Sequence, residues 1–198
     1  VGQLVTGCVS QIGEQAFNIG RTAWLAAGLP LSVAATTVDT QCGSSQQSVH
    51  FAAQAVMSGT SDLVVAGGVQ NMSAIPISSA MTLAQPLGFT DPFSGSEGWV
   101  ARYGPGEVSQ FRGAEMIAEK WGLSREQLDE FATRSQTLAA QATDEGRFDN
   151  EIVGVPVTTE DGDSVFDTDE TFRRGTTVEK LAQLKPSFQE DGKVTAGN

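Results

Sequence analysis

Cys42 lies in the segment TVDTQCGSSQQ, residues 37–47, at the point where a buried strand is expected to give way to a helix. The first turn of a helix offers unpaired backbone N–H groups and the positive end of the helix dipole. Both stabilise a thiolate, and the same N–H groups can hold the oxyanion of a tetrahedral intermediate. Gly43 permits a sharp turn and the close approach of a substrate. The position predicts Cys42 as a nucleophile; the alternative is a cysteine packed as a small hydrophobic residue.

The other candidate side chains give weaker evidence of a chemical role. His50 follows Cys42 by eight residues on the same expected helix. That spacing is about 12 Å along the axis, at ~1.5 Å per residue, so we interpret His50 as a packing or interface residue. Cys8 ends an apolar upstream segment, and we interpret it as structural. With 1 histidine and 2 cysteines, the chain has no metal-ligand spacing, and we expect no metal site.

The elements around Cys42 form a strand–helix–strand pattern. Residues 33–39 and 63–66 are short apolar runs, typical of buried strands. Residues 45–57 carry apolar side chains at helical spacing, and Gly59 ends that helix. Parallel strands with a crossover helix are expected, so the fold class is α/β.

The second part of the chain differs. Residues 86–106 are rich in glycine and proline and are predicted to be a loop. Helices are predicted at about 113–121 and from Ser124 to about 146, the second opened by a capping box with Gln127. An acidic, partly extended stretch at 151–171 follows.

Charge is unevenly distributed along the chain. The net charge is −12, which argues against nucleic acid and anionic membranes as partners, and no apolar run is long enough for a membrane span. Residues 1–101 hold 6 of the 36 charged side chains. This shift predicts a buried, sheet-rich first part followed by a solvated second part. We place the boundary after residue 72: residues 1–72 form part of a core domain, and 73–198 form a helical and loop-rich covering domain.

Several segments in the same order resemble the thiolases. VDTQCGSSQQSVHFAAQAVMSGTSDLVVAGGVQNMS is similar to the thiolase nucleophile segment, and VTGCVSQIGEQAFNIGRTAWLAAGLP to the strand and helix before it. GAEMIAEKWGLSREQLDEFATRSQ, GRFDNEIV and LKPSF…DGKVTAGN extend the likeness over essentially the whole chain. The resemblance implies a layered thiolase-like fold with a parallel-rich mixed sheet.

The resemblance also implies an activity. Thiolases move an acyl group between coenzyme A thioesters through a cysteine thioester, a role that falls on Cys42. The expected reaction is thiolytic cleavage of 3-oxoacyl-CoA or the reverse condensation of acetyl-CoA. Coenzyme A is then a substrate, and no tightly bound cofactor is expected. The alternatives are a ketoacyl-synthase-type condensing enzyme and a non-catalytic thiolase-like lipid-binding or scaffold subunit.

Three coenzyme A contacts follow from the resemblance alone. Arg173 maps to an arginine near the nucleotide end, whereas Phe188 and Ala196 map to residues beside the pantetheine arm. Each also has a structural interpretation, as a solvated basic residue or a packed side chain. Two departures, Gln70 in GGVQNM and Ser109-Gln110-Phe111 near the expected acyl pocket, fit longer or bulkier acyl chains.

The chain has the character of a piece of a longer protein. The opening VGQLVTGCVSQIG lacks a start methionine, and the later Asn-Glu, HGG and CxGGG motifs of thiolases do not occur. We therefore expect these 198 residues alone to be inactive. The cysteine usage favours a reducing, cytoplasmic setting, and thiolases imply a homodimer or homotetramer.

Overall fold

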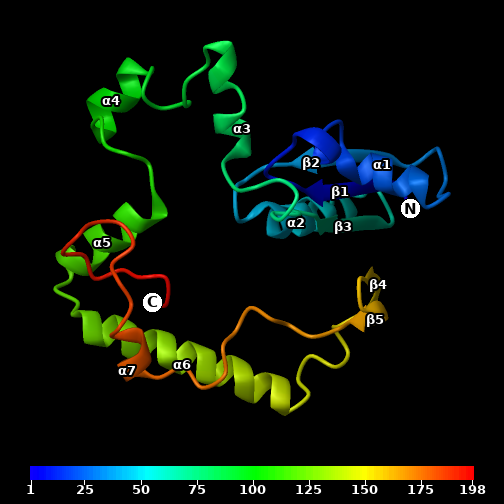
Figure 1. Ribbon diagram of the computed structural model, residues 1–198. Coiled ribbons are helices and arrows are strands. Elements are labelled where there is room, and N and C mark those ends of the chain that lie inside the picture. Colours follow the sequence, from blue (N-terminus) through cyan, green and yellow to red (C-terminus); the bar gives the residue numbers. More distant parts are fainter. The chain divides into compact units, whose positions relative to one another are not determined.

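The computed structural model describes residues 1–198. The chain divides into two compact units, Val1–Pro105 and Gly106–Asn198 (Figure 1). Each unit is described separately below. The assignment of residues 1–72 and 73–198 to the core and covering domains of a complete thiolase stays a prediction.

The first unit is built on a three-stranded parallel sheet. Its strands are β1 (Gln3–Gly7), β2 (Ala34–Val38) and β3 (Val64–Gly68), in the order β2-β1-β3. β1 is the most buried strand and pairs in parallel with both neighbours. The two predicted strands and their parallel direction are confirmed; the upstream segment, as β1, lies between them.

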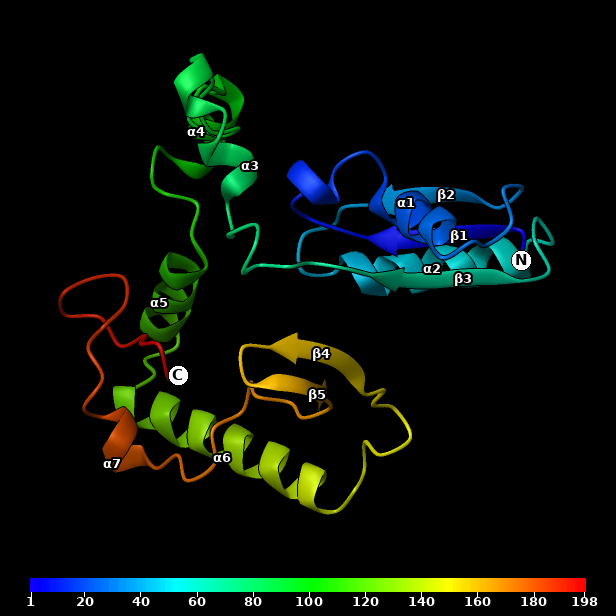
Figure 2. The same ribbon diagram turned by 45° about the vertical axis from the view of Figure 1, so that its right-hand side comes forward.

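Helices cover both faces of this sheet (Figure 2). A Cβ added to Gly20 in α1 (Ile19–Ala26) would lie 2.3 Å from Thr6 Oγ1, whereas one added to Gly7 would lie 2.6 Å from the backbone of Ser44 in α2 (Ser44–Met57). Because successive side chains of a strand point to opposite faces, α1 and α2 pack on opposite sides of β1. The helix predicted at residues 45–57 is confirmed.

The predicted loop at residues 86–106 is partly wrong. It contains α4 (Glu97–Tyr103) and overlaps a 3-10 turn, η2 (Gln85–Leu87). Ser96 caps α4 by accepting a hydrogen bond from the Trp99 N–H at 3.3 Å, so a helix begins despite the surrounding glycines and prolines. The remaining short elements of this unit are η1 (Gly13–Gln15) and α3 (Ser79–Thr82).

Helices are the main regular structure of the second unit. Both helices predicted there are present, as α5 (Gln110–Lys120) and α6 (Arg125–Asp144), and the capping box of Ser124 and Gln127 is formed. The extended stretch contains an antiparallel hairpin. The hairpin strands are β4 (Val155–Thr159) and β5 (Gly162–Phe166), and the short helix α7 (Val178–Leu181) follows.

The apolar side chains of α5 and α6 are covered only in part. Ala118 and Ala132 are buried, but Trp121 is 61% exposed and Phe131 76% exposed. This unit therefore holds its shape with few large apolar contacts, and its buried polar groups matter more. None of the helices has both the length and the apolar character needed to cross a bilayer.

Candidate active site

Cys42 is exposed and lies in a tight turn between β2 and α2. The residue before it, Gln41, adopts a left-handed backbone with φ of 54°. Asp39 Oδ1 accepts a hydrogen bond from the Gln41 N–H at 2.8 Å, and the Gln41 carbonyl accepts one from Ser44 N at 3.0 Å. A left-handed non-glycine residue stores about 1–3 kcal/mol of strain and persists only where its surroundings fix it. These hydrogen bonds therefore hold the turn that exposes Cys42 in a single conformation.

The serine side chains of α2 tie this turn to the helix. Ser44 Oγ accepts the Thr40 N–H at 3.0 Å and donates to the Gln41 carbonyl at 2.5 Å. One turn later, the completely buried Ser48 donates to the Ser44 carbonyl at 3.0 Å. These bonds fix the start of α2. The N–H groups of Gly43 and Ser44 already donate to the carbonyls of Thr40 and Gln41, at 3.2 and 3.0 Å, so the predicted oxyanion donors are the later N–H groups of this first turn.

Two strand glycines let the start of α2 approach the sheet. A Cβ on Gly7 would lie 2.6 Å from both the Ser44 C and Ser45 N atoms. A Cβ on Gly68 would lie 2.1 Å from Ser45 Oγ and 2.8 Å from the Gly7 carbonyl oxygen. Because the carboxyl ends of β1 and β3 carry no side chains here, the start of α2 can lie close to the sheet. This close packing fixes the position of the Cys42 turn relative to the sheet.

Two glutamines join the loops after β1 and β3. Gln70 Oε1 accepts hydrogen bonds from Val9 N at 3.3 Å and Ser10 N at 3.1 Å. In return, buried Gln15 accepts the Asn71 N–H at 2.7 Å and donates to the Ser10 carbonyl at 2.8 Å. Gln70, which the sequence offered as a clue to the substrate, thus supports a loop at the edge of the sheet that holds Cys42.

Cys8 lies beneath this edge and is 1% exposed. Its thiol faces Gln70 Oε1 at 3.9 Å. Burial, together with the negative charge of Asp39, raises the pKa of the Cys8 thiol above its ordinary value. A buried, protonated thiol is a poor nucleophile, in agreement with the structural role predicted for Cys8.

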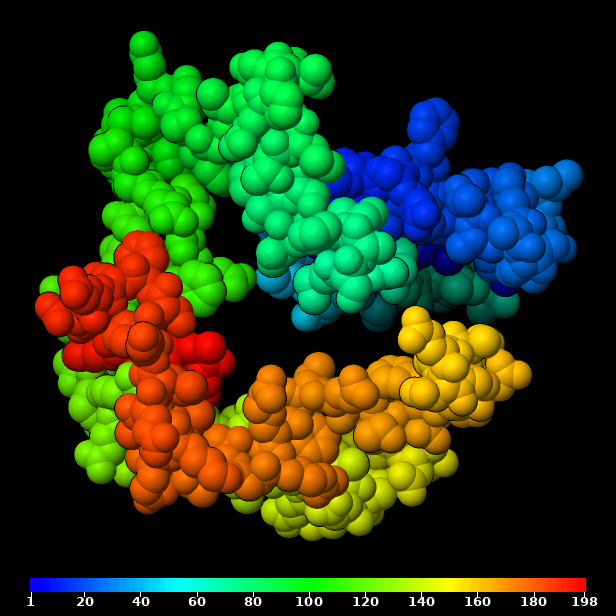
Figure 3. All heavy atoms as spheres, viewed as in Figure 1, coloured from blue at the N-terminus to red at the C-terminus, as the bar shows by residue number.

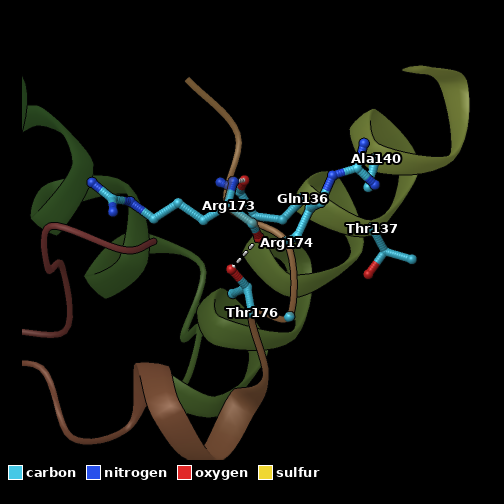
Figure 4. A pocket seen from close by; sticks show the side chains of 7 residues that line it. Gln136, Thr137, Ala140, Arg173, Arg174 and Thr176 are labelled. Carbon is cyan, nitrogen blue, oxygen red and sulfur yellow. Dashed lines mark hydrogen bonds between the residues drawn. The ribbon is translucent and has the colours of Figure 1, made fainter. Parts of the chain in front are cut away.

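In the second unit, Arg173 lines a cavity of about 250 Å³ (Figure 4). The floor is α6, and the opposite wall is the turn after Arg173. The lining residues are Gln136, Thr137, Ala140, Arg173, Arg174, Gly175 and Thr176. Gln136 Oε1 accepts the Arg173 N–H at 2.7 Å, and the Arg173 carbonyl accepts the Thr176 hydroxyl at 2.8 Å. The turn is thus anchored on both sides of Arg173.

The two arginines of this turn differ in their engagement. Arg174 makes a two-pronged ion pair with Asp144 at 2.8 and 2.9 Å, which lowers the pKa of that carboxyl. The Arg173 side chain extends away from α6 and is exposed (Figure 4). Arg173 is therefore the cation of this pair that is open to an anionic ligand.

Phe188 and Ala196 do not line the Arg173 cavity. Phe188 is half-buried and Ala196 exposed, on a segment closed by the pairing of Pro186 with Thr195. The Ser187 N–H donates to the Val194 carbonyl at 2.8 Å. The structure thus brings these two residues into one loop and leaves Arg173 on a separate turn.

Sequence reasoning missed two kinds of residue. Gln136, Thr137 and Ala140 show a helical spacing that places them on one side of α6, but nothing in their types marks a cavity. Gln41 carries no signal of a left-handed backbone, since that conformation is typical of glycine and asparagine. The cavity beside α6 depends on neighbours distant in sequence, and the backbone of Gln41 depends on its local turn.

Comparisons with known proteins identify the family of the chain. The family model described as the thiolase N-terminal domain matches residues 1–198. A steroid 3-ketoacyl-CoA thiolase of Mycobacterium tuberculosis is 53% identical over 196 residues, which cover 99% of this chain and 47% of that protein. A 3-ketoacyl-CoA thiolase of Hahella chejuensis is 41% identical over 201 residues, covering 100% of this chain and 48% of that protein.

A solved structure shows the same likeness. The crystal structure of the Bacillus anthracis acetyl-CoA acetyltransferase matches with a TM-score of 0.78 and 35% identity, over 100% of this chain and 50% of that one. The chain thus spans about half the length of the curated relatives it matches.

Proposed function

Because this chain belongs to the thiolase N-terminal domain family, we propose that it is part of an acyl-CoA C-acyltransferase in which Cys42 carries the acyl group. The observation that carries the proposal is the fixed turn before α2, which exposes Cys42 beside the first N–H groups of a helix. The first turn of α2 supplies N–H groups, beyond those of Gly43 and Ser44, that suit a developing oxyanion.

The proposed reaction has two steps. The Cys42 thiolate attacks the 3-carbonyl carbon of a 3-oxoacyl-CoA, and the bond between carbons 2 and 3 breaks. The carbon-2 fragment takes a proton and leaves as acetyl-CoA, while the rest of the chain stays on Cys42 as a thioester. Free coenzyme A then gives up its thiol proton and attacks the thioester, which releases the shortened acyl-CoA and restores Cys42. The reverse sequence condenses acetyl-CoA with an acyl-CoA.

Neither step is complete with the side chains of this chain alone. Thiolysis needs a base for each thiol and a proton donor for the leaving carbanion. His50, the sole histidine, is exposed on α2 and is two turns beyond Cys42. The acid–base groups are therefore assigned to the remainder of the full-length protein, and the 198-residue piece alone is expected to be inactive.

The proposed substrates are acyl-CoA thioesters with long or bulky acyl chains. Support comes from the name of the 53% identical relative, a steroid 3-ketoacyl-CoA thiolase. Arg173 is proposed to meet the nucleotide end of coenzyme A, and Phe188 and Ala196 its pantetheine arm. A homodimer or homotetramer in the cytoplasm remains part of the proposal.

The proposal is tested on the full-length protein with two 3-oxoacyl-CoA substrates, one straight-chain and one polycyclic. Thiolysis is followed by acetyl-CoA release, and the acyl adduct is located by peptide mass spectrometry. We expect the adduct on Cys42, its loss in Cys42→Ser, and its retention in the matched control Cys8→Ser. An adduct on Cys8, or one that survives Cys42→Ser, contradicts the assignment. An inert Cys42 in an intact full-length protein would favour the lipid-binding or scaffold alternative.

A further inference from the structure

The segment from Pro186 to Asn198 contains no helix or regular strand, yet two buried carboxylates hold its end. Glu115 on α5 is 7% exposed and Asp129 on α6 is 1% exposed. The segment lies against α5 and α6, as the red and green spheres of Figure 3 show. Burying two carboxylates is costly unless each is fully hydrogen-bonded, so the partners of each indicate what the pair is for.

Glu115 holds the backbone of the segment. Its two carboxylate oxygens accept the N–H groups of Lys193 at 3.1 Å and Val194 at 2.8 Å. The Lys193 ammonium then donates to the Leu123 carbonyl at 2.5 Å. Gly192 is required beside this carboxylate, because a Cβ there would lie 2.3 Å from Glu115 Oε1. The backbone is thereby fixed immediately before the turn formed by residues 195–198.

Asp129 holds the turn of residues 195–198 through the side chain of Asn198. Asn198 Nδ2 donates to Asp129 Oδ1 at 2.6 Å and to the Lys193 carbonyl at 3.2 Å. Asn198 Oδ1 accepts the Thr195 N–H at 2.8 Å. The Asn198 amide thus closes residues 195–198 into a turn and fastens it to α6. Ala196, in the middle of the turn, is left exposed.

Arg125 locks Asp129 from the other side. Its Nε donates to both carboxylate oxygens, at 3.0 and 2.9 Å, and its Nη2 donates to the carbonyls of Leu181 and Leu184. The same arginine therefore fixes the end of α7 relative to α6. Buried ion pairs of this kind are weak sources of stability compared with apolar packing, and their attested use is to select one arrangement.

We propose that Asp129 is a positioning residue for acyl-CoA binding, acting through Asn198 to present the Thr195–Asn198 turn to the pantetheine arm. The inference rests on the proposed function, which places Ala196 beside that arm. Pantetheine is a narrow chain with two amide groups, so a small exposed residue on a rigid turn suits it. The hydrogen bonds made by Glu115, Asn198 and Asp129 fix the backbone geometry that the turn offers to those amides.

The test uses full-length protein and measures coenzyme A binding by titration calorimetry, which does not depend on turnover. Asn198→Ala removes the bridge and leaves the Arg125–Asp129 pair intact. Loss of a charge-assisted hydrogen bond predicts a Kd for coenzyme A raised about 10-fold or more. Ala132→Gly, a buried position on α6 outside the network, is the control for lost stability. Thermal unfolding of both variants is recorded alongside.

A second variant pair separates positioning from simple damage. Asn198→Asp places a carboxylate against Asp129 and should weaken binding more than Asn198→Ala. Asn198→Gln keeps an amide that can donate to Asp129 and to the Lys193 carbonyl, and it should weaken binding less than Asn198→Ala. The inference is overturned if Asn198→Ala leaves the Kd for coenzyme A within twofold of the unaltered protein, or if Ala132→Gly raises that Kd equally. If the proposed function itself is wrong, the result is different: the unaltered protein forms no adduct on Cys42.

Discussion

Replacing Gly7 by alanine tests whether the close approach of α2 to β1 places Cys42. The new Cβ would lie 2.6 Å from Ser44 C and from Ser45 N. Both are backbone atoms, so neither can swing aside as a flexible side chain would. To restore ordinary contact at 3.4 Å, the first turn of α2 must move by about 0.8 Å.

The size of this displacement sets the expected effect. Overpacking a fitted contact costs about 1–3 kcal/mol of unfolding free energy. A reacting group moved by about 1 Å can lose on the order of 100-fold in rate. For Gly7→Ala we therefore expect a loss of about 1–3 kcal/mol and acylation of Cys42 slowed by roughly 30- to 100-fold.

Gly67→Ala is the matched control, because a Cβ at this β3 residue meets nothing within 4 Å. It should leave stability unchanged or raise it by up to about 1 kcal/mol, since alanine loses less backbone entropy on folding. Urea unfolding and single-turnover acylation, both on full-length protein, supply the two readouts. If Gly7→Ala matches Gly67→Ala in both, the argument that strand glycines set the position of Cys42 is wrong.

Two other predictions concern Cys8 and Arg173. The pKa of the Cys8 thiol is raised above 9.0 by burial and by Asp39, so its stabilising effect is full below pH ~9 and is lost as the pH rises further. Urea midpoints between pH ~8 and ~11 should fall less steeply in Cys8→Ala than in the unaltered protein, and equal slopes would disprove this. Arg173→Ala should weaken coenzyme A binding about 10-fold through loss of a charge-assisted contact, with Arg134→Ala as an exposed control on α6. Titration with pantetheine instead of coenzyme A should show no difference, and a difference there would place Arg173 away from the nucleotide end.

The elements that the sequence predicted are those with strong local signals. The runs at 33–39 and 63–66, the helical spacing at 45–57 and the Ser124–Gln127 capping box all depend on residues within one element. The loop prediction at 86–106 failed because glycine and proline dominated the pattern, whereas a single capping serine was sufficient to start α4.

The parts that escaped prediction depend on contacts between distant residues. Nothing near Asp129 in the sequence indicates that its carboxylate meets Asn198, and Glu115 meets Lys193 across a similar separation. The left-handed backbone of Gln41, by contrast, is held by bonds within its own turn, from Asp39 and Ser44, and escaped prediction because glutamine does not indicate that conformation. The sequence marked Cys42 as the reactive residue, but the supports that fix its turn come from the packed fold.

The two units fix their candidate site residues by different means. Residues 1–101, which hold 6 of the 36 charged side chains, set the Cys42 turn by its local hydrogen bonds and by steric fit, with Gly7 and Gly68 leaving room for the start of α2. The second unit has few large buried side chains and relies on the carboxylates Glu115 and Asp129. Added volume should therefore be most damaging near Cys42, and lost charge most damaging near the 195–198 turn. Since each unit is sensitive to a different kind of substitution, acylation of Cys42 and affinity for coenzyme A can be altered separately.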